Sequence, residues 1–122
     1  MRNSRLLGKR WEQIAEAHLV EQGLVILERG YHCRLGELDL VALDAGALVV
    51  VEVRYRGRSD FGSALESVTW RKQNRILRAT RHYLMRHPQH AARPLRIDIV
   101  AIDRGAAAKP TLTWLRNAFG ET

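Results

Sequence analysis

The sequence predicts an α/β fold with a mixed central β-sheet flanked by helices. Two stretches repeat apolar residues at three- and four-residue steps, which is the spacing of amphipathic helices. Five short runs rich in apolar and β-branched residues are separated by turn residues, which is typical of strands. Because 122 residues is the size of one ordinary domain, we expect a single domain over residues 1–122.

The helices and strands are expected in the order α-β-β-β-α-β-β. Their expected bounds are, in chain order, 5–22 for the first helix, 24–28, 37–43 and 47–54 for three strands, 64–86 for the second helix, and 95–102 and 111–115 for the last two strands. Residues 29–36 are expected to form a turn that leads into the second strand, and 56–63 a loop rich in Gly and Ser. A last helical turn is expected over 116–119.

The composition excludes some classes of protein and favours others. No run of about 18 apolar residues is present, so we expect no membrane-spanning helix. The first residues are polar and basic and lack the apolar segment of a secretory signal, so we expect a cytoplasmic protein. The single cysteine, Cys33, can form neither an internal disulfide nor a paired zinc motif. The net charge of +7 and the sequence pI of about 10.5 favour phosphate-rich partners, which are DNA, RNA or an anionic surface.

Two acidic residues interrupt the apolar strands of the expected hairpin. If Ala45 and Gly46 form a two-residue loop, the register puts Asp39 opposite Glu52, with Cβ atoms roughly 4.5–5.5 Å apart. Like charges at this distance are destabilising unless a positive group lies between them. Because Mg²⁺ and Mn²⁺ prefer carboxylate and carbonyl oxygens, this register predicts a metal site on Asp39 and Glu52, with the Val53 main-chain carbonyl as a third ligand.

Two other interpretations of the hairpin stay open. Ala-Gly is not the favoured Asn-Gly loop, and a three-residue loop would shift the register by one residue. Asp39 would then lie beside Val51, on the opposite face from Glu52. Charged residues in strands also commonly form a solvent-exposed face and nothing more.

The hairpin sequence resembles a known bacterial family. "GELDL" and "VVEVRYR" match the pattern G-E-[IL]-D-L followed by [FV]-V-E-V-[KR]-x-R, which is typical of the YraN family. The resemblance runs nearly end to end, because four further stretches also match: "GKRWEQIAEAHL", "SVTWRKQNRILRATRHYL", "LRIDIVAI" and "WLRNAF". Several ordered motifs over most of the chain make the match specific.

The YraN family is similar in turn to the restriction-endonuclease-like superfamily, and particularly to archaeal Holliday-junction resolvases. This resemblance implies a core of α-β-β-β-α-β order and a phosphodiesterase site that depends on Mg²⁺ or Mn²⁺. It implies that Asp39 takes the first acidic strand position, and that Glu52 and Arg54 take the E-x-K element. It also implies that Glu12 is the acid of the first helix, as a metal ligand or through water, and that Gln73 is a polar site residue of the following helix.

The chain departs from the superfamily pattern at two positions. Leu38 stands where a proline commonly precedes Asp39, which the resolvase-like branch tolerates. Arg54 stands where the general pattern has lysine. Arginine stays protonated and cannot act as a base, but it can clamp a phosphate through two hydrogen bonds and stabilise charge in the transition state. Cleavage would therefore depend on the metal ion to generate the nucleophile.

Basic residues surround the motifs. We expect six of them to contact a nucleic-acid backbone: Arg56, Arg58, Arg71, Lys72, Arg75 and Arg78. The alternative for this set is an ordinary solvated surface.

Three single residues are also noteworthy. Trp70 and Tyr55 could stack on an unpaired base, although packing in the core or at its rim is the favoured interpretation. Asp98 interrupts a strand, and a structural salt bridge to an arginine is favoured over a catalytic role.

The function expected from these residues is that of a metal-dependent endonuclease acting on DNA rather than RNA, including branched or structured DNA. A homodimer is also implied, since resolvases cut a four-way junction at two symmetric positions. The main alternative is a nucleic-acid-binding module that keeps the fold without catalysis, because Arg54 replaces lysine. A protein-interaction scaffold, in which the basic residues are incidental, is a third.

Overall fold

The computed structural model describes residues 4–57, 64–104 and 109–120, with side chains from residue 9 onward. The elements are α1 (Ser4–Glu21), β1 (Val25–Cys33), β2 (Gly36–Asp44), β3 (Ala47–Arg56), the 3₁₀ turn η1 (Leu65–Ser67), α2 (Trp70–Arg86), the 3₁₀ turn η2 (Pro88–His90), β4 (Leu95–Asp103) and β5 (Thr111–Phe119). This succession of helices and strands confirms the predicted order. None of the helices in these ranges is long and apolar enough to cross a membrane.

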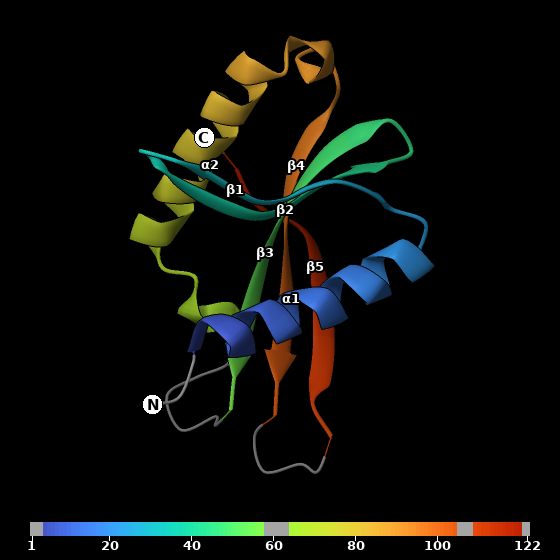
Figure 1. Ribbon diagram of the computed structural model, residues 1–122, viewed down its shortest axis with the longest axis vertical. Coiled ribbons are helices and arrows are strands. Elements are labelled where there is room, and N and C mark those ends of the chain that lie inside the picture. The colour runs from blue at the N-terminus through green and yellow to red at the C-terminus, as the bar shows by residue number, and fades with distance from the viewer. Residues whose placement is uncertain (1–3, 58–63, 105–108, 121–122) are drawn as a thin grey trace.

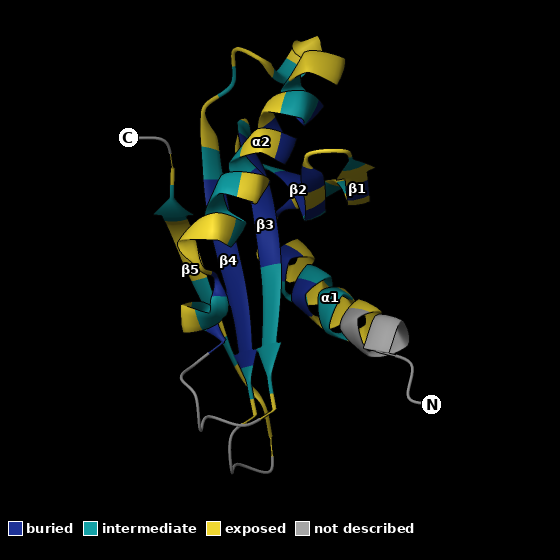
Figure 2. Cartoon of the chain, turned by 90° about the vertical axis from the view of Figure 1, so that its left-hand side faces the viewer, coloured by how far each residue is buried: buried dark blue, intermediate teal, exposed yellow. Residues whose placement is uncertain are grey.

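The five strands form one mixed sheet in the order β1-β2-β3-β4-β5. Neighbouring strands are antiparallel except β3 and β4, which are parallel. The helix α2 lies in the connection from β3 to β4, which is the long crossover that a parallel pair needs. Figures 1 and 2 show α1 and α2 on opposite faces of the sheet. The predicted α/β class with a mixed, helix-flanked sheet is confirmed, and the arrangement is consistent with a nuclease-like fold.

Each face of the sheet packs against one helix. Ile76 and Tyr83 of α2 share a core cluster with Val50, whereas Leu19 of α1 shares the other cluster with Val49. Successive residues of β3 thus serve opposite faces, as the two-residue period of a strand requires. The middle of the sheet is buried on both sides (Figure 2), so a charged side chain there has few ways to reach water.

The β2–β3 hairpin turns at Ala45 and Gly46, with φ angles of 51° and 91°. Two consecutive positive φ angles are typical of the tight two-residue hairpin turn. The strands pair in the register that such a loop sets, with Leu40 opposite Val51. The predicted two-residue loop is confirmed, and the three-residue alternative is wrong.

The strand β1 is longer than predicted and includes most of the expected turn over 29–36. It runs to Cys33, and Tyr31 pairs with Leu38 across the β1–β2 ladder. Pairing with the following strand, β2, therefore decides the conformation of a stretch whose local composition favours a turn.

The helix α2 begins at Trp70, later than predicted. Thr69 caps it, because its Oγ1 accepts a hydrogen bond from the Lys72 main-chain N at 3.2 Å. The preceding residues form η1 instead, and the Ala64 N–H donates to Asp103 Oδ1 at 2.7 Å. The cap and this contact with the end of β4 keep the 3₁₀ turn apart from the helix.

The strand β5 is also longer than predicted. It continues through residues 116–119, expected to form a helical turn, and ends at Phe119, which pairs with Ile97. A register shift in the ladder and a positive φ of 52° at Asn117 accommodate the extra length.

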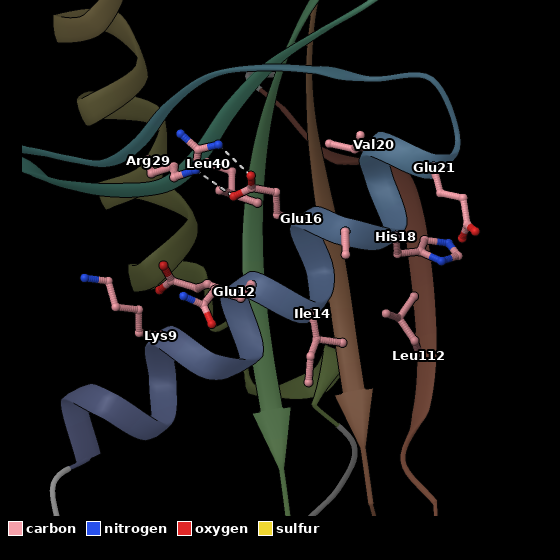
Figure 3. A pocket seen from close by; sticks show the side chains of 12 residues that line it. Lys9, Glu12, Ile14, Glu16, His18, Val20, Glu21, Arg29, Leu40 and Leu112 are labelled. Carbon is pink, nitrogen blue, oxygen red and sulfur yellow. Dashed lines mark hydrogen bonds and ion pairs between the residues drawn. The ribbon is translucent and has the colours of Figure 1, made fainter.

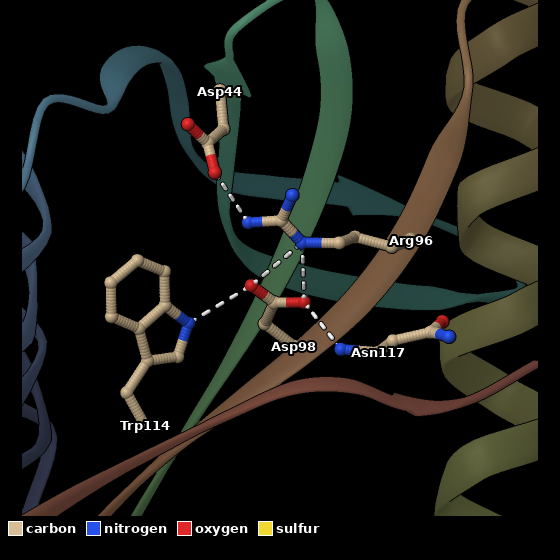
Figure 4. A network of polar contacts seen from close by, with 5 residues as sticks. All are labelled: Asp44, Arg96, Asp98, Trp114 and Asn117. Carbon is tan, nitrogen blue, oxygen red and sulfur yellow. Dashed lines mark hydrogen bonds and ion pairs between the residues drawn. The ribbon is translucent and has the colours of Figure 1, made fainter.

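The buried Asp98 anchors this last strand (Figure 4). Its carboxylate accepts hydrogen bonds from Arg96 Nε at 3.0 Å, Trp114 Nε1 at 2.9 Å and the Asn117 N–H at 2.9 Å. Arg96 also donates to Asp44 at 2.7 Å. The predicted structural salt bridge of Asp98 is confirmed, and the network ties β5 to β4 and to the β2–β3 hairpin.

Candidate functional site

A small cavity lies where the start of β2 passes the second half of β3, and we call it the acidic cavity. Its volume is about 250 Å³. It is lined by Trp11 and Glu12 of α1, Glu37 and Asp39 of β2, Glu52, Val53, Arg54 and Tyr55 of β3, and Lys72 of α2. Four carboxyl groups and two cationic groups therefore face the cavity, so full ionisation would leave an excess of two negative charges.

Asp39 and Glu52 converge where the main-chain pairing of β2 with β3 ends. The last pair joins Leu40 to Val51. Beyond this pair, the Val53 N–H has a side-chain acceptor instead of a main-chain carbonyl of β2. It donates to Asp39 Oδ2 at 2.8 Å. Glu52 is 5% exposed. The charge of Asp39 and a hydrogen bond between the two side chains both raise the pKa of Glu52, so the acids converge as the hairpin register predicted.

Burial raises the pKa of three acids in this cavity. The pKa of Glu52 lies well above its ordinary value because burial, and then the charge of Asp39, disfavour its ionised form. Burial also raises the pKa of Asp39, although hydrogen bonds from the Val53 N–H and Glu52 act in the opposite direction. The pKa of Glu12 is raised to about 7 by burial and by Asp39. Without a bound cation, these groups therefore retain protons at pH values where ordinary carboxyl groups are ionised.

Glu12 thus lies over the sheet rather than in open solvent. It is half-buried on α1, and Asp39 acts on its pKa through both charge and a hydrogen bond. Asp39 consequently interacts with one acid from β3 and one from α1. Among the described residues, however, no three His, Cys, Asp or Glu side chains form a ready metal-ligand cluster.

Two cationic groups approach Glu52 from different elements. Arg54 Nη1 lies 3.6 Å and Lys72 Nζ 3.9 Å from Glu52 Oε2, both longer than a hydrogen bond. The Nε of Arg54 donates to Ser67 Oγ at 2.9 Å, which fixes the guanidinium group beside η1. Lys72 was expected only to contact the nucleic-acid backbone. Its place beside Glu52 depends on how α2 docks on the sheet, and the only hint in the sequence was the missing lysine at position 54.

Gln73 does not line the acidic cavity. Its Nε2 donates to the Val68 carbonyl at 3.2 Å, and its own N–H donates to the Thr69 carbonyl at 2.9 Å. The Gln73 side chain thus links the first turn of α2 to the segment that precedes the helix. The structure therefore brings together four of the five residues predicted for catalysis, and Gln73 lies apart from them.

Aromatic side chains form one wall of the cavity. The rings of Trp11 and Tyr55 stack with centroids 4.1 Å apart, which confirms the packing interpretation for Tyr55. The buried Nε1 of Trp11 has no hydrogen-bond partner among the described residues. Trp70 differs from expectation, because its side chain is 77% exposed and packs in no core.

The predicted nucleic-acid contacts lie at the surface around this site. Arg71, Arg75 and Arg78 are exposed along α2, and Arg56 is half-buried at the end of β3. Arg58 lies outside the described residues.

A larger cavity, of about 840 Å³, lies along α1, and Arg29 of β1, Leu40 of β2 and Leu112 of β5 also line it (Figure 3). Its central charges neutralise each other, because Arg29 donates to both carboxylate oxygens of Glu16, at 2.8 and 2.6 Å. Figure 3 shows Glu12 and Lys9 at one end of this cavity. Size alone therefore does not select a candidate site, and the unbalanced charge of the smaller acidic cavity makes it the stronger candidate.

Comparison with known proteins identifies relatives over nearly the whole chain. The model of a family described as "Uncharacterised protein family UPF0102" matches residues 11–102. A UPF0102 protein of Stutzerimonas stutzeri (strain A1501) is 47% identical over 119 residues, which cover 98% of each chain. A UPF0102 protein of Alcanivorax borkumensis is 41% identical over 119 residues, covering 98% of this chain and 95% of the relative. The UPF0102 protein lpg2994 of Legionella pneumophila is 44% identical over 112 residues, covering 92% of each chain.

Proposed function

The chain belongs to the UPF0102 family of YraN-like proteins, and from its acidic cavity we propose that it is a metal-dependent endonuclease. Its substrate is DNA, including branched or structured DNA, and its cofactor is Mg²⁺ or Mn²⁺. The observation that carries the proposal is the convergence of the buried Glu52 and the half-buried Asp39, whose negative charges would repel each other in a small cavity. Both members of such a pair can ionise together only if a cation binds between them.

The donor atoms of the cavity fit a hard divalent cation. Asp39 and Glu52 supply carboxylate oxygens. The Val53 N–H points at Asp39, and the N–H and C=O of a strand residue point to the same edge, so the Val53 carbonyl is directed to the same side. Mg²⁺ commonly takes one or two carboxylates and fills its other positions with waters and substrate phosphate, so a third acidic ligand is not required. When fully ionised, the cavity has an excess of two negative charges, which one such ion with two positive charges would balance.

The residues of the cavity then have distinct roles. The bound ion would lower the pKa of a water molecule and neutralise charge on the attacked phosphate. Asp39 and Glu52 hold the ion, and Glu12 orients the water around it through its half-buried carboxyl group. Arg54 and Lys72 lie on the Glu52 side, where a phosphate that enters the cavity meets their positive charges. Gln73 lies outside the cavity and takes no part in the proposed reaction.

The experiment is a cleavage assay on purified protein with Mn²⁺ or Mg²⁺ and equal amounts of single-stranded, linear duplex, flapped and four-way DNA. We expect metal-dependent nicking that is lost in Asp39→Asn and Glu52→Gln. The matched control is Glu21→Gln, which changes an exposed glutamate at the end of α1 and should cleave like the wild type. Circular dichroism of each variant separates lost chemistry from lost folding.

One observation favours the alternative of a binding module without catalysis. Arg54 replaces the expected lysine and is held by Ser67 and Glu52 rather than directed freely at the cavity. If folded wild-type protein binds DNA in a salt-dependent manner but nicks none of these substrates with either metal, the endonuclease proposal is wrong and this alternative stands.

A further inference from the structure

A second cavity, of about 590 Å³, adjoins the acidic cavity, and we call it the basic groove. It lies between the turn that joins β1 to β2 and the first two turns of α2. Arg34 lines it from the β1–β2 turn, and Arg71, Lys72 and Arg75 line it from α2. Glu37 is its one carboxylate, and His32 Nδ1 lies 3.4 Å from Glu37 Oε1.

Three of the four cations of this groove have no ion-pair partner within the described part of the chain. No carboxylate there forms an ion pair with Arg34, Arg71 or Arg75. Several like charges around one hollow repel each other, and an anion that enters the hollow removes that repulsion. A phosphate backbone is a ligand that carries several negative charges in a row.

The two walls of the groove are held at a fixed spacing. At Gly36, where φ is +155°, an added Cβ would lie 3.1 Å from the main-chain oxygen of Arg75. Glycine therefore allows the β1–β2 turn to pack closely against α2. Arg34 and the arginines of α2 consequently face one hollow rather than separate surfaces.

Trp70 indicates which kind of nucleic acid the groove takes. It is the first residue of α2, next to Arg71, and its side chain is 77% exposed. Trp70 stands next to the groove-lining Thr69 and Arg71 in the sequence, and an exposed indole beside cations is a suitable platform for base stacking. In a duplex the faces of each base are covered by its neighbours, so this platform fits an unpaired base.

From these observations we infer that the basic groove binds an unpaired DNA strand, with Arg34, Arg71 and Arg75 on its phosphates and Trp70 stacked on a base. Glu37 and Lys72 line both cavities, so the groove continues into the acidic cavity and leads the strand there. Only this last step, delivery of the strand to a cleavage site, rests on the proposed endonuclease function.

Cys33 provides the test, because it is the only cysteine of the chain, is half-buried and lines the groove. Its rate of modification by N-ethylmaleimide is measured by mass spectrometry in EDTA, so that no cleavage occurs. A 12-nucleotide oligothymidylate should slow the reaction at lower concentration than a 12-base-pair duplex does. Trp70→Ala should raise the required oligothymidylate concentration about tenfold, since stacking on one aromatic residue is worth roughly 1–3 kcal/mol. Trp70 is exposed, so this variant is expected to fold.

Two matched controls lie at the other end of α2. Met85→Ala removes a side chain that is 79% exposed, and Arg86→Ala removes an exposed cation, and neither should change the protection of Cys33. Equal protection by duplex and single strand, or an unchanged Trp70→Ala variant, would overturn the inference. Protection without any metal-dependent nicking would refute the endonuclease proposal alone, whereas nicking without protection would refute the groove alone.

Discussion

Replacing Glu12 by Gln should change how the stability of the metal-free protein depends on pH. The groups that act on Glu12 are Asp39 and Glu37, which raise its pKa together with burial, and Lys9, which lowers it. A carboxyl group whose pKa is higher in the folded than in the unfolded state stabilises the fold below its unfolded pKa. That contribution is lost as the pH rises through the folded pKa. For Glu12 the window therefore runs from about 4.5 to about 7.

The size of the effect follows from the same values. The difference between 4.5 and about 7 corresponds to about 3 kcal/mol at 1.36 kcal/mol per pKa unit. Because Glu12 is only half-buried, solvent screening reduces this to roughly 1–2 kcal/mol. Gln does not titrate, so Glu12→Gln does not undergo this loss. Between pH 4 and pH 8, the free energy of unfolding of the variant should therefore rise by this amount relative to that of the wild type.

The assay is urea denaturation in EDTA at several pH values, with Glu16→Gln as the matched control. Glu16 lies one turn further along α1, and its hydrogen bonds with Arg29 lower its pKa. Its contribution is present above the unfolded pKa and lost as the pH falls, so Glu16→Gln should lose stability relative to the wild type as the pH rises. If both variants shift in the same direction, or if Glu12→Gln shows no shift, the desolvated acidic cavity described above is refuted.

At one fixed Mn²⁺ concentration, the melting temperature of the wild type should rise more at pH 7.5 than at pH 6, because the carboxyl groups must lose protons before they bind the ion. Asp39→Asn should abolish this rise, and a rise that persists in the variant would place the ion elsewhere. Ala45→Asn should stabilise the protein by about 0.5–1 kcal/mol in urea denaturation, since Ala45 has a φ of 51° in a turn that prefers Asn before Gly46. Asp98→Asn should destabilise it by about 3 kcal/mol, because Asn has one acceptor oxygen whereas donors bind both oxygens of the buried Asp98 carboxylate. A loss below about 1 kcal/mol would contradict the anchoring role of Asp98.

The hairpin and its two acids could be predicted because they depend on short-range rules. A two-residue loop sets the register, and the two-residue period of a strand sets the face, so Asp39 and Glu52 had to converge once the loop was correct. The extent of β1 could not be predicted in this way. Its second half has the composition of a turn, and pairing with β2 makes it a strand in spite of that composition.

The positions of Lys72 and Gln73 depended on a different kind of information. Their helical spacing was predicted correctly, but the start of α2 was not, because the Thr69 cap and the contact of Ala64 with Asp103 override the propensity of the preceding residues. Within the observed first turn, Lys72 lies at the acidic cavity, whereas Gln73 binds a main-chain carbonyl.

The position of positive charge in space matters more for this site than the residue at one motif position. The sequence suggests a defect, since Arg54 replaces a lysine and cannot give up its proton. In the folded chain, Arg54 is held by Ser67, while Lys72 brings an ammonium group to the same Glu52 oxygen from α2. The Lys72 side chain is 42% exposed, compared with 27% for Arg54, and it lines both the acidic cavity and the basic groove. Under the proposed function, a DNA phosphate that passes from the groove to the cavity would therefore meet Lys72 first and then Arg54 beside Glu52.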